Sequence, residues 1–201
     1  EEELIEVLTE QVIEMAITES QSWLENGLRI NMSVNVSAKN ISSLSLPEHL
    51  SRLITGKQLD SSLITLEVTE SQLMGELVTS LDTLTRLRMK GFGLSIDDFG
   101  TGYSSLSQLH KIPFSELKID QSFIFNMTSD KDALAIVETC IMLSHKLGMV
   151  CVAEGVETKE HLDILAELGC DIAQGYYFAR PMEGAKIYEW AFQNKPRVAN
   201  G

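Results

Sequence analysis

The sequence has little positive charge. Its 201 residues include 16 lysines and arginines against 29 aspartates and glutamates, which gives a formal net charge of −13. A groove for bulk nucleic acid needs a basic footprint, so this balance argues against such a partner. It also means that a phosphate-bearing substrate would be repelled unless bound cations intervene.

Cysteine is scarce as well. The chain has three, Cys140, Cys151 and Cys170, all in apolar surroundings. An odd number without metal-ligand spacing is typical of reduced core residues and argues against a disulfide framework or a zinc site. We therefore expect a cytoplasmic protein.

Long apolar runs are missing too. No stretch reaches the length of a membrane helix, and no signal peptide is visible. We expect no membrane contact from this chain, while an inner-membrane anchor and sensor or output domains elsewhere in a parent protein remain compatible with it. Repeats, low-complexity segments and internal linkers are also absent, and 44% hydrophobic residues suffice for the core of one domain.

Apolar periodicity predicts an alternation of strands and helices. The predicted strands cover residues 29–36, 63–68, 92–96, 116–119, 149–153 and 171–173. The predicted helices cover 3–24, 45–56, 77–90, 104–109, 132–147, 158–168 and 184–192. Six strands that alternate with helices over short connections indicate a parallel α/β protein.

A closed β/α barrel needs eight strands, whereas this sequence offers six and opens on a helix. We therefore predict a modified TIM-type (β/α)8 barrel that lacks its first strands, with an open doubly wound sheet as the structural alternative. Residues 1–192 are expected to form the domain and residues 193–201 a polar tail.

Polar residues stand where each predicted strand ends. One such residue is more often a turn or cap residue, but six strands in succession favour an active site at the carboxyl edge of the sheet. The residues are Asn35, Glu67, the pair Asp97 and Asp98, Lys118, Glu154 and Gln174.

The types of these residues indicate a chemistry. Asparagine, aspartate and glutamate are oxygen ligands, which suit Mg²⁺ or Mn²⁺ better than softer metals. Asp97 and Asp98 repel each other unless cations or protons neutralise them, and together they could flank two cations. Lys118 could orient an attacking water or stabilise charge, and a salt bridge to a neighbouring acid is its structural alternative.

Several motifs resemble a known family, in matching order and spacing. They are Asn35-Val36-Ser37, Glu67-Val68-Thr69-Glu70-Ser71, the run from Asp97-Asp98-Phe99-Gly100 to Leu106, Leu117-Lys118-Ile119-Asp120, Ala153-Glu154-Gly155-Val156-Glu157 and Gln174-Gly175-Tyr176-Tyr177-Phe178. From about residue 1 to 192 the chain resembles the EAL domain of bacterial cyclic-di-GMP phosphodiesterases.

The resemblance implies hydrolysis of cyclic di-GMP to linear pGpG on a modified β/α barrel, with two Mg²⁺ or Mn²⁺ ions. By resemblance, the metal ligands are Asn35, Glu67, Asp97, Asp98 and Glu154, and the catalytic residues are Lys118, Glu154 and Asp97. Gln174, Tyr176 and Pro181 would bind substrate, although the last two are equally well explained as core. Glu70 and Glu157 would hold the Asp97–Asp98 loop in shape from behind the metal ligands. A homodimer through the region of that loop is also implied.

The sequence departs from the family at its start, where the Glu-Ala-Leu triplet, its strand and a nearby arginine are absent. One metal ligand is therefore missing. This motivates an alternative function, a non-catalytic receptor that binds cyclic di-GMP and acts through a partner. A protein kinase, suggested by Asp98-Phe99-Gly100, is rejected because no His-Arg-Asp catalytic loop and no kinase glycine-rich loop occur.

Overall fold

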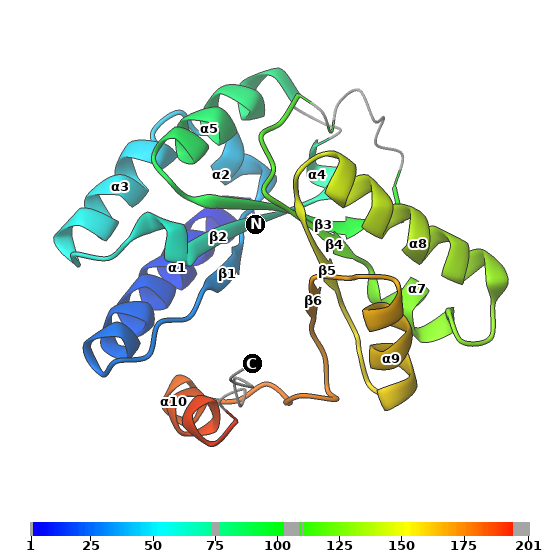
Figure 1. The fold of residues 1–201 in the computed structure, drawn as a ribbon. Helices are drawn as coiled ribbons and strands as arrows, with labels where there is room; N and C mark the ends of the chain where they lie inside the picture. Colours follow the sequence, from blue (N-terminus) through cyan, green and yellow to red (C-terminus); the bar gives the residue numbers. More distant parts are fainter. Residues whose placement is uncertain (1, 74–76, 103–108, 110, 195–201) are drawn as a thin grey trace.

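The strands form one parallel sheet. A computed structural model describes residues 2–73, 77–102, 109 and 111–194. Within this part of the chain the strands are β1 (Met32–Asn35), β2 (Ile64–Thr69), β3 (Gly93–Phe99), β4 (Glu116–Ile119), β5 (Val150–Ala153) and β6 (Ile172–Ala173). They pair in parallel in the order β1-β2-β3-β4-β5-β6. The sheet curls, with helices over its outer face (Figure 1).

The longer predicted helices are confirmed. They are α1 (Glu2–Glu25), α3 (Leu46–Gly56), α5 (Leu77–Met89), α8 (Lys131–Lys146), α9 (Lys159–Glu167) and α10 (Gly184–Gln193). Thr158 caps α9 as predicted, because its side chain accepts a hydrogen bond from the backbone of His161. The helix expected over residues 104–109 lies almost entirely outside the described residues.

Among the described residues, three short α-helices were not predicted: α2 (Ala38–Ser42), α4 (Glu70–Leu73) and α7 (Gln121–Asn126). Each has six residues or fewer, which is too short for an apolar period to stand out. Two predicted strands also differ from the observed strands by more than one residue at an end. The first is shorter than residues 29–36, and β3 continues past residue 96 through both aspartates.

The core lies between the sheet and its helices. Leu66 on β2, Ile96 on β3 and Leu117 on β4 are fully buried, as are Leu84 and Leu87 of α5. Along the strands, the buried leucine and isoleucine residues alternate with the polar residues that face the inside of the curl. One sheet therefore carries both the core and the candidate site.

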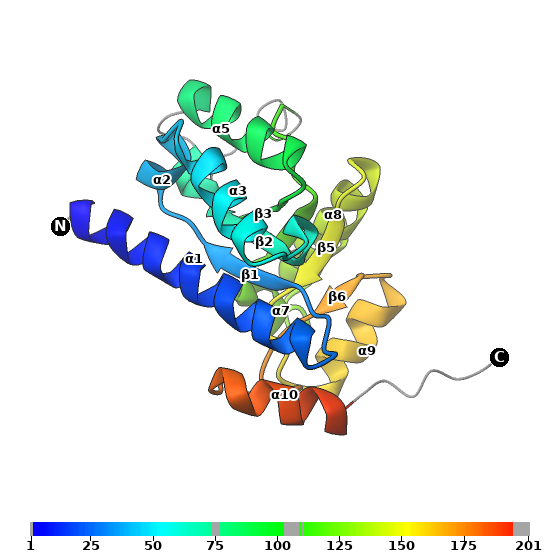
Figure 2. The ribbon, with the colours of Figure 1, turned by 90° about the vertical axis from the view of Figure 1, so that its left-hand side faces the viewer.

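The sheet is a half-barrel, so the prediction of a (β/α)8-type barrel without its first strands is confirmed. Among the described residues β1 and β6 each pair on one side only. Helix α1 runs along β1, and α10 lies beside the carboxyl end of α1 (Figure 2). There the Tyr188 hydroxyl donates a hydrogen bond to the Asn26 carbonyl at 3.0 Å.

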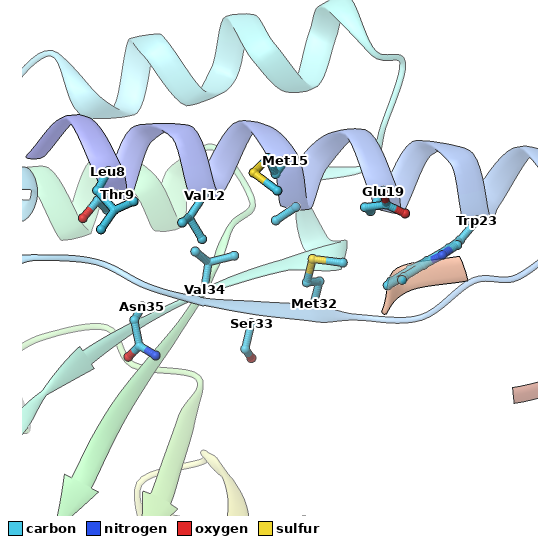
Figure 3. Close-up of a pocket in the computed structure, with 12 residues that line it drawn as sticks. Leu8, Thr9, Val12, Met15, Glu19, Trp23, Met32, Ser33, Val34 and Asn35 are labelled. Atoms are coloured by element: carbon cyan, nitrogen blue, oxygen red, sulfur yellow. The ribbon is translucent and has the colours of Figure 1, made fainter. Parts of the chain in front are cut away.

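An apolar pocket of about 550 Å³ is lined by residues of α1 and β1. Leu8, Val12 and Met15 line it from the helix, and Met32 and Val34 line it from the strand, while Asn35 points away from α1 (Figure 3). None of the helices in the described part of the chain is long and apolar enough to cross a membrane.

Candidate active site

A buried lysine lies among three carboxylates at the carboxyl edge of the sheet. The Lys118 Nζ atom is 3.0 Å from Glu67 Oε1, 3.0 Å from Asp97 Oδ1 and 2.7 Å from Glu154 Oε1. The lysine is 4% exposed. Each partner comes from a different strand or strand end, so the parallel order of β2 to β5 brings together residues far apart in the sequence. The salt bridges foreseen for Lys118 as a structural alternative are therefore present.

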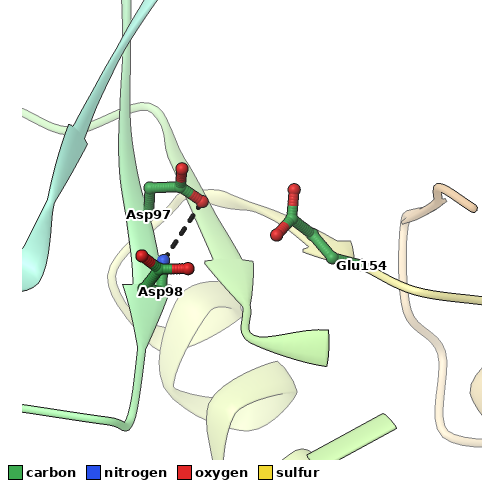
Figure 4. Close-up of side chains that lie close together, drawn as sticks. All are labelled: Asp97, Asp98 and Glu154. Atoms are coloured by element: carbon green, nitrogen blue, oxygen red, sulfur yellow. Dashed lines mark hydrogen bonds between the residues drawn. The ribbon is translucent and has the colours of Figure 1, made fainter. Parts of the chain in front are cut away.

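Asp97 and Asp98 lie at an irregularity of β3. The pairing with β4 runs from Ile96 opposite Leu117 to Phe99 opposite Ile119, so β3 advances three residues while β4 advances two. Such an extra residue re-aims side chains that would otherwise alternate between the two faces. Asp98 has a φ of 55°, a left-handed conformation, and its backbone N–H donates to Asp97 Oδ1 at 3.1 Å (Figure 4).

The Asp97–Asp98 loop is tied to the preceding strand by Glu70. This glutamate follows β2 directly, is buried, and its Oε2 accepts the N–H groups of Gly100 and Gly102, both at 3.1 Å. A side chain on Gly102 would collide with the Glu70 carboxyl carbon, at 2.8 Å from its Cβ. The contact expected between Glu70 and this loop is therefore present in the structure.

Three carboxylates are close enough to share a cation. One oxygen each from Asp97, Asp98 and Glu154 lie within 4.8 Å of one another, with Glu154 facing the aspartates across the edge (Figure 4). Glu67 joins them through Lys118. Asn35 lies opposite Glu67 in the register of β1 and β2 and is exposed. An all-oxygen set of this kind fits Mg²⁺ or Mn²⁺.

The electrostatics of the cluster favour a cation. Burial raises the pKa of the Asp98 carboxyl, and the negative charges of Asp97 and Asp120 raise it further. Burial also raises the pKa of Glu154, although Lys118 opposes that rise. For Lys118 burial alone would lower the pKa, but Glu67 and Glu154 outweigh it and raise the pKa above its usual range. The lysine is therefore charged at neutral pH.

A second pocket, of about 240 Å³, lies beside Glu154. Gln174 and Tyr176 line it from the end of β6, and Glu157 lines it from the turn after Glu154. Arg180 stacks over the Tyr176 ring at 4.6 Å from its centroid. Tyr176 is half exposed, so it is not a core residue. Pro181 is exposed and is not among the residues that line this pocket.

In the described part of the loop, no hydrogen bond joins the Glu157 side chain to Gly100 or Gly102. Among the described residues, the side-chain hydrogen bonds to the backbone of Gly100 and Gly102 come from Glu70. The backbone N–H of Glu157 instead faces His161 Nδ1 at 3.5 Å.

The sequence analysis included Asp120 in a motif but assigned it no role, and it did not predict the helix that Asp120 begins. Asp120 caps α7, where its Oδ1 accepts the backbone N–H of Ser122 at 3.0 Å, and its carboxylate also lies against Asp98. Helix α7 adds Gln121 and Phe125 to the lining of the second pocket. The available signal was an aspartate two positions after Lys118 at a strand end, the same signal that singled out the other site residues.

Comparisons with known proteins agree with this geometry. The profile of the family described as EAL domain matches residues 1–181. The chain is 40% identical over 179 residues to the cyclic di-GMP phosphodiesterase RocR of Pseudomonas aeruginosa, a match covering 89% of this chain and 46% of RocR. It is 40% identical over 185 residues to MucR of the same organism, named a bifunctional diguanylate cyclase/cyclic di-GMP phosphodiesterase, covering 92% and 27%. The chain thus spans about half or less of these relatives.

Solved structures share the fold. The PaMucR phosphodiesterase in complex with c-di-GMP superposes with a TM-score of 0.87 at 40% identity, covering 92% of this chain and 75% of that chain. The EAL domain of Mycobacterium smegmatis DcpA gives 0.88 at 34% identity, covering 92% and 84%. With a profile that spans most of its length and relatives of the same architecture, the chain belongs to the EAL domain family.

Proposed function

We propose that this chain is the catalytic part of a phosphodiesterase that hydrolyses cyclic di-GMP to linear pGpG in bacterial second-messenger signalling, with Mg²⁺ or Mn²⁺ as cofactor. The observation that carries the proposal is the buried contact of Lys118 with Glu67, Asp97 and Glu154. Relatives named as cyclic di-GMP phosphodiesterases, and a solved relative in complex with c-di-GMP, support the choice of substrate.

The chain supplies the ligands for the cations. Asp97, Asp98 and Glu154 would hold them, with Glu67 and Asn35 at the adjoining strand ends. Bound Mg²⁺ or Mn²⁺ supplies the Lewis acidity that neutralises phosphate oxygens and lowers the pKa of a water. Glu70 fixes the backbone that aims Asp98, because it holds two amides of the following loop.

Lys118 acts at the reacting atoms. Its ammonium is charged and buried, so it can orient the attacking water and offset the charge that develops on the phosphate. Gln174 and Tyr176 bind the nucleotide beside Glu154, with Glu157 in the same pocket wall and Pro181 further along that loop. Opening one of the two phosphodiester bonds of the cyclic substrate then yields the linear product.

The parent protein would act in the cytoplasm and carry sensor or output domains, since this chain matches only part of its curated relatives. A homodimer through the region of the Asp97–Asp98 loop is part of the same proposal. Residues 103–108, which belong to that region, lie outside the described residues.

The test is turnover of cyclic di-GMP by the full-length protein with Mn²⁺ or Mg²⁺, followed by chromatography of the nucleotides. Asp97→Asn and Lys118→Ala should each abolish formation of pGpG. Lys90→Ala, which removes a lysine paired with Glu48 on the protein surface, should leave turnover unchanged. Tight calorimetric binding of cyclic di-GMP without any hydrolysis by the folded, metal-loaded protein would reject catalysis and favour the non-catalytic receptor.

A further inference from the structure

The two turns that carry the clustered carboxylates share a feature. Gly100 comes two residues after β3 residue Asp98, and Gly155 comes directly after Glu154. Both glycines have a positive φ, 100° and 72° respectively, and so occupy conformations that side chains rarely allow. The two glycines therefore mark the points where the backbone turns away from the cluster of Asp97, Asp98 and Glu154.

Both glycines press against the same short helix, α7. A Cβ on Gly100 would lie 2.9 Å from the Phe123 Cε2 atom. A Cβ on Gly155 would lie 2.6 Å from the Gln121 Cβ and 3.2 Å from the Phe125 Cζ. Both distances below 3.0 Å are shorter than real Cβ contacts, so on each side the backbone of the turn lies in direct contact with the helix.

The helix itself is firmly held. It begins three residues after Lys118, and the Asp120 side chain caps its first turn. Ile124, in its middle, is fully buried in the core, and the helix packs against α8. Because α7 is fixed at its first turn and by its buried residue, it does not shift when the two glycine turns move. The positions of the turns are therefore set by the helix.

From this arrangement we infer that α7 is a spacer that sets the separation of the Asp97–Asp98 carboxylates from the Glu154 carboxylate, with Phe123 as its positioning residue on the aspartate side. The inference rests on the proposed metal site. Phe123 touches neither a ligand atom nor the substrate pocket in the described contacts. It acts through the backbone of the loop at Gly100, whose N–H is also held by the Glu70 carboxylate.

The sensitivity of a metal site makes this spacing matter. Ligand distances tolerate about 0.2 Å, and groups that orient ligands from outside typically contribute about 10–100-fold to metal affinity. Trimming the Phe123 ring removes the contact that stops the loop from moving toward α7. Asp98, already in a left-handed conformation, would then relax toward a more common one and carry its carboxylate away from Glu154.

The experiment uses Phe123→Leu and Phe123→Ala in the full-length protein. Binding of Mn²⁺ alone is followed by the loss of its free electron paramagnetic resonance signal, and melting temperature and circular dichroism are recorded in parallel. The matched control is Phe92→Leu, a fully buried phenylalanine at the opposite end of β3. We expect Mn²⁺ to bind about tenfold more weakly to Phe123→Leu and still more weakly to Phe123→Ala. Phe92→Leu should lower the melting temperature and keep the wild-type affinity.

A second readout is the metal dependence of turnover. The Phe123 variants should need more Mn²⁺ for half-maximal turnover and recover part of their kcat when it is supplied in excess. If they melt earlier but bind Mn²⁺ as the wild type does, the spacer inference is wrong while the proposed function stands. If the wild type itself binds no Mn²⁺, both the proposed metal site and the spacer inference are wrong. Should Phe123→Ala not fold, the comparison of Phe123→Leu with Phe92→Leu decides.

Discussion

Replacing Lys118 by methionine removes a buried ammonium from between Glu67, Asp97 and Glu154 while keeping most of its volume. In the ion-free protein the three carboxylates then face one another without a resident cation. All three are at least four-fifths buried, and their oxygens lie 2.7–3.0 Å from the nitrogen that is removed. We predict a large loss of stability that divalent cations reverse.

The magnitude follows from the cost of breaking a buried ion pair. Removal of one partner typically lowers the free energy of unfolding by about 3–5 kcal/mol, because the charge left behind stays buried. Uptake of protons limits this loss, since the pKa of Glu154 is already raised by burial and would rise further without Lys118. The destabilisation should therefore grow as pH increases and protonation becomes less available.

Mn²⁺ should then bind more tightly to the variant than to the wild type, because it no longer shares the carboxylate oxygens with an ammonium. Relief of only about 1.4 kcal/mol of that competition corresponds to about tenfold in affinity. Saturation at about 100 times the dissociation constant adds about 2.7 kcal/mol of stability. Turnover should be lost in the same variant, so that affinity and activity change in opposite directions.

The assay is urea unfolding of the wild type, Lys118→Met and Lys90→Met, each without metal and with Mn²⁺, together with calorimetric titration of Mn²⁺. Lys90→Met, which breaks a surface pair with Glu48, should match the wild type under all conditions. Equal stability of Lys118→Met and the wild type without metal, together with equal Mn²⁺ affinity, would refute the idea that the lysine is a resident counter-ion.

Three further predictions concern the surroundings of the site. Glu70→Ala leaves two loop amides without their acceptor and should weaken Mn²⁺ binding about 10–100-fold. Glu70→Gln keeps a carbonyl oxygen at that position and should weaken Mn²⁺ binding far less. Equal Mn²⁺ affinities of the two variants in a titration would contradict this prediction. Because burial raises the pKa values of Asp98 and Glu154, protons compete with a cation for these carboxylates at higher pH than for ordinary carboxylates. Mn²⁺ affinity should therefore fall as the pH is lowered, and calorimetry in buffers of different ionisation enthalpy should show proton release on binding. The backbone N–H of Cys151 holds the pKa of Asp171 below its usual value of 3.8, so the ionised carboxylate stabilises the fold above that pH, and this stabilisation is lost as the pH falls through the lowered pKa. Asp171→Ala should lower the free energy of unfolding by about 1–3 kcal/mol at neutral pH. Asp171→Asn should lower it little there, and urea unfolding of this variant should no longer show the acid dependence.

The sequence predicted the six strands because buried parallel strands leave strong local signals. Apolar runs end at Glu67, Lys118 and Glu154, and parallel strands place such ends on one edge. The contact of Lys118 with all three carboxylates could not be predicted, since it depends on how far the sheet curls. Local sequence patterns predict neither the curl of the sheet nor the distance between two strand ends.

The irregularity at Asp97 and Asp98 was also beyond prediction. The sequence suggested that both aspartates follow a strand, whereas they lie inside β3 at a point where its register against β4 shifts. Such a shift is decided by hydrogen bonds between strands, which no single segment encodes. Asp120 was overlooked for a different reason. An aspartate before a helix is normally a cap, and Asp120 is one, in addition to lying against Asp98.

The lysine and its three carboxylates also bear on how the sheet assembles. Backbone hydrogen bonding between parallel strands is nearly the same after a slip of one residue, but every side chain then changes face. A slip of β4 by one position would turn Lys118 toward the helices and leave the acids of β2, β3 and β5 crowded together with no cation. Correct pairing is thus the arrangement in which the charges of four neighbouring strand ends compensate one another. This one side chain thus adds an electrostatic penalty for misaligned sheets to the penalty that the apolar core already imposes.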